Sequence, residues 1–248
     1  MMKNDTVDFG FKKVRTDEKQ QLVARVFDSV ASRYDIMNDL MSLGIHRLWK
    51  RHAVALLQIR SNHHVLDLAC GSGDLALLMA PSLKNGEITL SDINSNMLNL
   101  AKNRLLDKGF IGNTHFSLAN AECLPFQANT FDRIIMGFGL RNVTHKEQAL
   151  ASIYRVLKPG GRAIILEFSH PTNALLSSWY DKYSFHVLPF LGKIMANDEM
   201  SYRYLAESIR MHPCQEKLKD MMQQSGFDVC DYFNLTGGIV AIHQGIKY

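Results

Sequence analysis

The chain has 248 residues, 46% of them hydrophobic, which is enough to bury a large core. No apolar run approaches the roughly 18 residues that suggest a membrane-spanning helix, and the N-terminus shows neither a secretory signal nor a transit peptide. The four cysteines lack zinc-ligand spacing, so we expect a cytoplasmic protein with free thiols and no metal.

The net charge of +4 is unevenly distributed, because the whole excess of basic residues lies within residues 1–60. Such a surface can contact anionic lipid or an acidic partner, and it can equally be a solvated helical face. No basic and aromatic stripe or known nucleic-acid module accompanies it. We therefore expect no nucleic-acid partner.

Two helices are predicted ahead of the first strand. Within residues 18–34 the apolar positions recur at helical spacing, with Thr16 and Asp17 as candidate caps. A second helical pattern covers residues 45–57. Both helices precede the predicted sheet, so they can pack over it as a cover.

From residue 64 onward, short apolar runs typical of strands alternate with helical stretches. Such alternation indicates parallel strands joined by helices. The last two predicted strands flank a short turn at residues 236–238, which requires them to be antiparallel. The predicted strands are residues 64–69, 87–92, 114–118, 131–137, 162–168, 227–233 and 239–246.

A long helical insert rich in large apolar side chains separates the fifth and sixth predicted strands. After it, Pro213 stands where a further helix begins and Gly226 where that helix stops. No linker or repeat divides the chain, so we predict a single domain over residues 1–248. Its parts are a helical cover (1–60), a cofactor-binding core (61–170), the helical insert (171–212), and a C-terminal helix and hairpin (213–248).

A tight loop of small residues follows the first predicted strand. Gly71 and Gly73 let the backbone approach a ligand closely, and Asp92 ends the second strand, where a carboxylate can accept both hydroxyls of a ribose. The loop also fits the dinucleotide pattern G-x-G-x-x-A. On its own it is therefore compatible with NAD as well as with S-adenosylmethionine.

Three neighbouring features favour S-adenosylmethionine over NAD. Asp67 would repel a pyrophosphate but attract the amino group of a methionine moiety. Asn120 and Ala121 follow the third strand, where they can read an adenine, and a Pro-Gly-Gly turn at residues 159–161 leads into the fifth. Each feature also has a structural explanation, such as a loop cap or an Asx turn. Five parallel strands before an antiparallel hairpin match the class I methyltransferases, and a nicotinamide oxidoreductase is the alternative.

Longer motifs lie at residues 34–42 with His46 and Trp49, and at residues 138–144, 155–161 continuing to 166–169, 183–189 and 202–209. Together they resemble the ubiquinone/menaquinone C-methyltransferase family, and the resemblance runs from about residue 9 to the last residue. The resemblance implies an α/β class I S-adenosylmethionine-dependent methyltransferase. Its Rossmann-like sheet would be mostly parallel and seven-stranded, with an antiparallel C-terminal strand and an N-terminal helical cover.

The resemblance also implies which residues contact the donor. Gly137 stands where the family commonly has a serine, so any contact there must come from the backbone. Together with the glycine loop, the predicted donor-binding residues are Gly71, Ser72, Asp92, Asn120, Ala121 and Gly137.

The implied reaction is C-methylation of a polyprenylated quinol, either demethylmenaquinol, a methoxy-polyprenyl-benzoquinol or both, with S-adenosylhomocysteine as the spent donor. A ring hydroxyl, with a pKa of about 10 by analogy with tyrosine, must lose its proton before the ring carbon can attack. We expect Arg141 to favour the anion and Asn142 to orient a water that removes the proton. Candidates to line the quinol pocket are Tyr34, Asp35, Asn38 and His46.

The prenyl tail suggests that residues 171–212 form a lid and contact the inner face of the membrane. Other quinone-biosynthesis enzymes are candidate partners, and the oligomeric state stays open, a homodimer included. The alternatives to a quinol methyltransferase are a methyltransferase of another small molecule and a non-catalytic scaffold of a quinone-biosynthesis complex.

Overall fold

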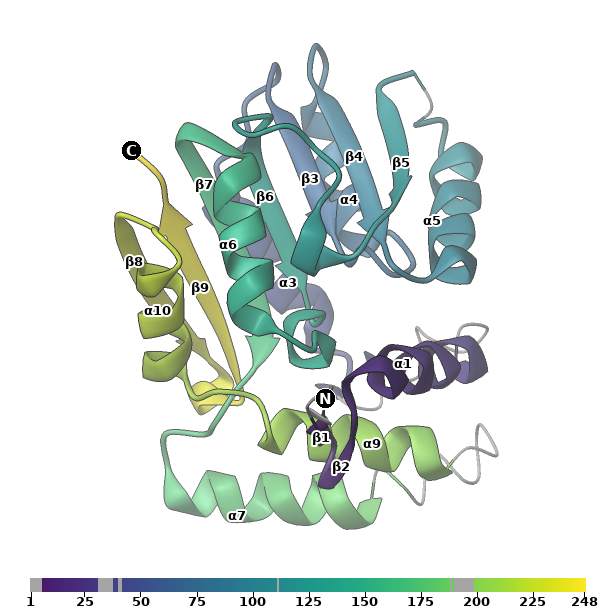
Figure 1. Ribbon diagram of the computed structural model, residues 1–248, viewed down its shortest axis with the longest axis vertical. Helices are drawn as coiled ribbons and strands as arrows, with labels where there is room; N and C mark the ends of the chain where they lie inside the picture. The colour runs from purple at the N-terminus through teal and green to yellow at the C-terminus, as the bar shows by residue number, and fades with distance from the viewer. Residues whose placement is uncertain (1–5, 31–37, 40–41, 111, 188, 190–198) are drawn as a thin grey trace, which may run out of the picture.

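The structure is a computed structural model that describes residues 6–30, 38–39, 42–110, 112–187, 189 and 199–248. Within these ranges the chain forms a seven-stranded sheet and a separate two-stranded sheet. Helices cover both faces of the larger sheet, and a further layer lies beneath the carboxyl ends of its parallel strands (Figure 1).

The larger sheet has the strand order β5-β4-β3-β6-β7-β9-β8. The first five strands in the sequence are parallel, and β9 runs antiparallel to both of its neighbours. The chain moves outward from β3 in one direction and then in the other, and ligands of open α/β sheets bind at the carboxyl ends of the strands beside such a reversal. The strands are β3 (His64–Leu68), β4 (Glu87–Asp92), β5 (Thr114–Leu118), β6 (Phe131–Gly137), β7 (Leu157–Phe168), β8 (Val229–Leu235) and β9 (Val240–Ile246).

The predicted fold class is confirmed, and all seven predicted strands are present. The largest difference in bounds is at β7, which begins at Leu157 because Leu157 already pairs with Phe131. The pairing register then shifts before Arg133 pairs with Arg162. The Pro-Gly-Gly turn therefore lies inside the strand as an irregularity.

Two hydrophobic clusters fill the two faces of the sheet, as the alternation of strand side chains requires. Ile135 faces one cluster and its neighbour Ile134 faces the other. Helices α3 (His46–Leu57), α4 (Asp74–Met79) and α5 (Ser95–Asp107) cover the first face. Helices α6 (Lys146–Val156) and α10 (Gln215–Gln224) cover the second.

The layer beneath the carboxyl ends of the parallel strands is formed by residues 6–30 and by the helices of the insert (Figure 1). It contains a hairpin that the sequence did not predict, so the N-terminal cover is not purely helical. Glu207 fixes the hairpin by accepting a hydrogen bond of 3.0 Å from the backbone N–H of Phe11. The layer comprises β1 (Thr6–Phe9), β2 (Lys12–Arg15), α1 (Thr16–Val30), α7 (Ala174–Lys182), the π-helix η5 (Tyr183–Val187) and α9 (Glu199–Arg210).

Among the described helices, none combines the length and the apolar character needed to cross a membrane.

Candidate active site

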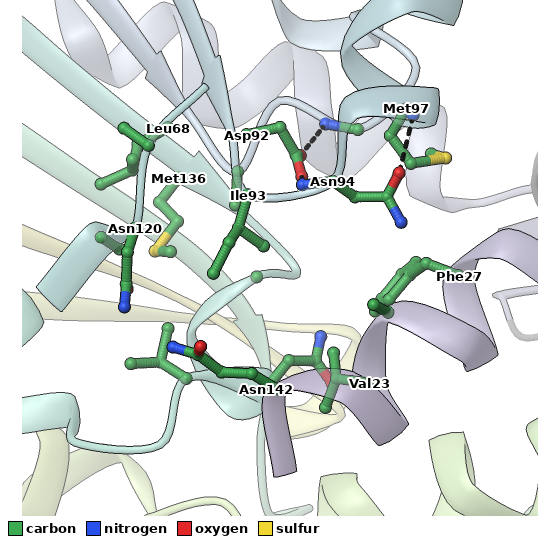
Figure 2. Close-up of a pocket in the computed structure, with 18 of the residues that line it drawn as sticks. Val23, Phe27, Leu68, Asp92, Ile93, Asn94, Met97, Asn120, Met136 and Asn142 are labelled. Atoms are coloured by element: carbon green, nitrogen blue, oxygen red, sulfur yellow. Dashed lines mark hydrogen bonds between the residues drawn. The ribbon is translucent and has the colours of Figure 1, made fainter. Parts of the chain in front are cut away.

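A cavity opens at the carboxyl ends of β3, β4, β5 and β6, with α1 forming its opposite wall (Figure 2). It encloses about 820 Å³ of free space, part of which is open to solvent. We call it the donor cavity. The residues of the predicted donor site that line it are Gly71, Asp92, Asn120, Ala121 and Gly137.

The loop after β3 turns sharply because three of its residues have positive φ angles. These are 53° at Ala69, 54° at Gly71 and 81° at Gly73. A Cβ on Gly73 would also lie 3.1 Å from the Cβ of Ala101 on α5. Glycine is therefore required there by both conformation and packing, and the turn exposes backbone to the cavity.

Asp92 at the end of β4 is held by two backbone groups. Its Oδ2 accepts a hydrogen bond from the N–H of Gly71 and its Oδ1 accepts one from the N–H of Asn94, both at 2.9 Å. Burial raises the pKa of Asp92. Each carboxylate oxygen keeps a second lone pair, so the fixed carboxylate can still accept the two hydroxyls of a ribose.

The far side of the donor cavity suits a flat, largely apolar base. Ile93 and Met136 project into it next to Asn120 (Figure 2). The Oδ1 of Asn120 accepts the backbone N–H of Glu122 at 2.9 Å. Asn120 therefore forms an Asx turn, which was the structural explanation offered for it above. It also lines the donor cavity.

Two residues near the glycine loop, one in β3 and one in the loop itself, lie differently from what the sequence suggested. Ser72 and Asp67 are buried, but neither lines the donor cavity. The Oδ2 of Asp67 accepts the N–H of Ala76 at 3.0 Å, while its Oδ1 has no hydrogen-bond partner among the described residues. Burial raises the pKa of Asp67 to about 8, so its charge depends on what lies next to it.

Helix α1 covers the donor cavity with Val23 and Phe27, which face Asp92 and Ile93 across it (Figure 2). Asp28 on the same helix accepts hydrogen bonds of 2.9 Å from the side chains of Asn94 and Asn96. These contacts were not predicted. The only signal in the sequence was the apolar face of the helix, which is equally typical of core packing.

The predicted catalytic pair separates in the structure. Asn142 lines the donor cavity, and its Oδ1 accepts a hydrogen bond of 3.0 Å from the hydroxyl of Tyr204. Arg141 instead lines a second cavity, and its guanidinium pairs with the carboxylate of Glu167 at 2.8 Å. The charge of Arg141 is thus compensated inside the protein, a relationship that the sequence did not reveal.

The four candidates for the quinol pocket are only partly placed. Tyr34 and Asp35 lie outside the described residues. His46 is buried and its Nε2 lies 2.9 Å from the Oδ1 of Asp39, and it does not line the donor cavity. Asn38 is half-buried and does not line it either.

Together, the strand order, the glycine loop and the acid that ends β4 give this chain the fold of the class I S-adenosylmethionine-dependent methyltransferases. Solved structures share this fold. A SAM-dependent methyltransferase from Aquifex aeolicus superposes with a TM-score of 0.61 at 15% identity, covering 85% of this chain and 96% of that one. A SAM-dependent methyltransferase from Thermotoga maritima, described as a possible histamine N-methyltransferase, gives 0.63 at 18% identity, covering 90% and 99%.

The chain belongs to the ubiE/COQ5 methyltransferase family, whose model matches residues 14–247. A ubiquinone/menaquinone biosynthesis C-methyltransferase UbiE from Marinomonas sp. (strain MWYL1) is 58% identical over 244 residues, 98% of this chain and 97% of the relative. A protein of the same name from Methylococcus capsulatus is 57% identical over the full length of both chains. The resemblance found in the motifs is confirmed, and the nicotinamide alternative is wrong.

Proposed function

We propose that this protein transfers a methyl group from S-adenosylmethionine to a ring carbon of a polyprenylated quinol in ubiquinone or menaquinone biosynthesis. The observation that carries the proposal is the identity of 57 to 58% with relatives of that activity, over nearly the whole chain. Demethylmenaquinol, the methoxy-polyprenyl-benzoquinol and both together remain the candidate acceptors.

The donor cavity suits S-adenosylmethionine, which supplies an activated methyl group when bound. The Asp92 carboxylate would hold the ribose hydroxyls, and the turn of Asn120 and Ala121 would hold the base. The backbone at Gly71 and Gly137 would allow the remaining part of the donor to approach closely. Helix α1 covers one side of the cavity and would limit the access of water to a bound donor, which would help to align the reacting groups and strengthen nearby electrostatic interactions.

The acceptor must be ionised for efficient attack, because a phenolate places far more electron density on the ring than a phenol does. We assign Asn142 the orientation of the acceptor oxygen or of the water that removes its proton, because its side chain lines the donor cavity. Arg141 lies behind Asn142 and is paired with Glu167. We therefore assign Arg141 a positioning role that acts through the loop carrying Asn142.

The prenyl tail requires an apolar surface, and the layer beneath the sheet offers one. Trp179 on α7 is 75% exposed, Met200 on α9 is 78% exposed and Phe11 in the hairpin turn is 59% exposed. We propose that this layer receives the tail and rests on the membrane surface. Flotation with liposomes, with and without anionic lipid, tests the contact, and a Trp179→Ser variant should float less than the wild type. Equal flotation of the two, or none of the wild type, would argue against it.

Quinone profiles of cells that lack this protein test the proposed reaction. Mass spectrometry should show a demethylated quinone accumulating, and its ring identifies the natural acceptor. Wild-type protein should restore the methylated quinone, whereas an Asp92→Asn variant should not. Full restoration by Asp92→Asn would support the scaffold alternative, and an unchanged quinone profile would refute the proposal.

A further inference from the structure

A second cavity lies between the N-terminal hairpin, α1, the start of α6 and α9, with about 600 Å³ of free space. We call it the cationic cavity. Among the described residues that line it, four are cationic, namely Lys13, Lys19, Arg141 and Lys146, and one, Asp8, is acidic.

Two of these cations have a carboxylate partner. Lys13 pairs with Asp8 at 2.7 Å, and Arg141 pairs with Glu167 at 2.8 Å. Lys19 and Lys146 form no ion pair with any described residue. Both Nζ atoms instead donate to one backbone oxygen, that of Val143, at 3.3 Å each.

Two ammonium groups that share one carbonyl oxygen repel each other, and burial strengthens the repulsion. Lys19 is only 4% exposed. Burial, and then the neighbouring Lys146, lowers the pKa of Lys19 to about 8, and burial also lowers the pKa of Lys146. A buried charge without a partner is costly, so an anion between the two lysines would stabilise this arrangement.

The cationic cavity adjoins the donor cavity through one short segment. Thr144 lines both cavities, and Val143, whose oxygen holds the two lysines, lines the donor cavity. Tyr204 lines the cationic cavity and donates its hydroxyl to Asn142 of the donor cavity. An acceptor ring in the donor cavity would therefore lie next to the cavity that contains the lysine pair, whereas the charge of Arg141 is compensated by Glu167.

We propose that the cationic cavity receives a ring oxygen of the quinol, that Lys19 in its neutral form removes the proton from that oxygen, and that Lys146 holds the resulting anion. This inference rests on the proposed function. The O–H bond breaks with its electron pair left on oxygen, and the proton moves to Nζ of Lys19. A ring electron pair then forms the new C–C bond, and the C–S pair returns to sulfur. The ring C–H proton leaves to solvent, and Lys19 returns its proton to the oxygen.

The charged groups that face the lysine pair come from several elements. They are Asp8 from β1, Lys13 from β2, Glu122 from the short helix after β5, Arg141 and Glu167 as an ion pair, Glu147 from α6, and His212, which follows α9. In the wild type, turnover should rise with pH through the pKa of Lys19, about 8. Without Lys19 the rise should move toward the pKa of the free hydroxyl, about 10.

The test measures turnover against pH with S-adenosylmethionine and a reduced, short-chain demethylmenaquinone. Lys19→Met should lower turnover near neutral pH by about 100-fold or more and move the midpoint upward, with unchanged affinity for S-adenosylhomocysteine. Lys19→Arg keeps the charge but not the titration, so it should also lose the midpoint near 8. Lys12→Met, at an exposed lysine of the N-terminal hairpin that precedes α1, is the matched control and should behave as the wild type.

A Lys19→Met variant with wild-type turnover and midpoint would overturn the proposal. If Lys19→Met fails to fold, Lys19→Arg with an unchanged midpoint would overturn it equally. Wild-type protein that methylates no quinol at all would instead refute the proposed function, and this inference with it.

Discussion

The hydroxyl of Tyr204 on α9 donates a hydrogen bond of 3.0 Å to the side-chain oxygen of Asn142 at the edge of the donor cavity. Burial raises the pKa of Tyr204, so the phenol stays protonated and acts as the donor. The bond fixes which end of the Asn142 amide faces the tyrosine. It therefore connects the layer beneath the sheet with the residue that we assign to the reaction.

A Tyr204→Phe variant removes this hydrogen bond and keeps the aromatic ring, which stacks on the ring of Phe9 with 4.2 Å between the ring centroids. A typical hydrogen bond contributes about 1 kcal/mol, so we expect turnover to fall about fivefold. Binding of S-adenosylhomocysteine should not change. Steady-state kinetics and calorimetric titration measure the two effects, and unchanged turnover would remove this bond from the mechanism.

The Arg141–Glu167 ion pair is buried, with side chains 3% and 1% exposed. Removing one partner of such a pair leaves an uncompensated charge, so Glu167→Gln should lower the free energy of unfolding by about 3 to 5 kcal/mol. Adding Arg141→Met should recover part of that loss. Urea unfolding of both single variants and the double variant gives the coupling, and strictly additive effects would contradict a buried pair. The exposed pair of Arg15 and Asp17 is the control, where Arg15→Met should change little.

Gly137 and Gly139, two glycines beside the donor cavity, differ in the atoms that an added Cβ would contact. A Cβ on Gly139 would lie 2.6 Å from the Cβ of Ala69, whereas one on Gly137 would meet only the end of the Leu75 side chain, at 2.8 Å. Leu75 can rotate, but Ala69 cannot yield without moving the glycine loop. Gly139→Ala should therefore destabilise the fold by about 1 to 3 kcal/mol and weaken S-adenosylhomocysteine binding more than Gly137→Ala does. Thermal unfolding and titration compare the two, and equal losses would contradict this packing.

Asp67 should make stability depend on pH. Its pKa is about 8 in the folded chain and about 3.9 in an unfolded one, so the folded state binds the proton more tightly. The contribution of Asp67 to the free energy of unfolding should then fall as the pH rises from about 4 to about 8, and level off above that. Asp67→Asn removes the titration, so the variant should gain stability relative to the wild type across this window. Urea unfolding at a series of pH values measures the difference, and a constant difference would mean that Asp67 is ionised throughout.

The sheet could be predicted, and so could the position of most predicted donor-binding residues around one cavity, because the signals for both are local. Each strand is a short apolar run, and the glycine loop and Asp92 lie at the ends of such runs, so the topology brings them together. The hairpin at residues 6–15 was missed because each of its strands has only four residues, and the second, Lys12–Arg15, offers a single apolar position among three charged ones.

The contacts on which the proposed mechanism depends could not be predicted from the sequence. Arg141 and Glu167 are 26 residues apart, and Tyr204 lies 62 residues from Asn142. Lys19 lies 124 residues from the carbonyl that it shares with Lys146. No local pattern predicts such pairings, because they depend on how the lower layer packs against the strand ends.

The most direct test of the central claim is methyl transfer to a quinol by the purified protein. The protein is incubated with S-adenosylmethionine carrying an isotopically labelled methyl group and with reduced demethylmenaquinone or the methoxy-polyprenyl-benzoquinol. We expect mass spectrometry to find the label on a ring carbon of at least one quinol, with one S-adenosylhomocysteine formed for each methyl transferred. Label on an oxygen, or none on either quinol while S-adenosylhomocysteine still binds, would contradict the account.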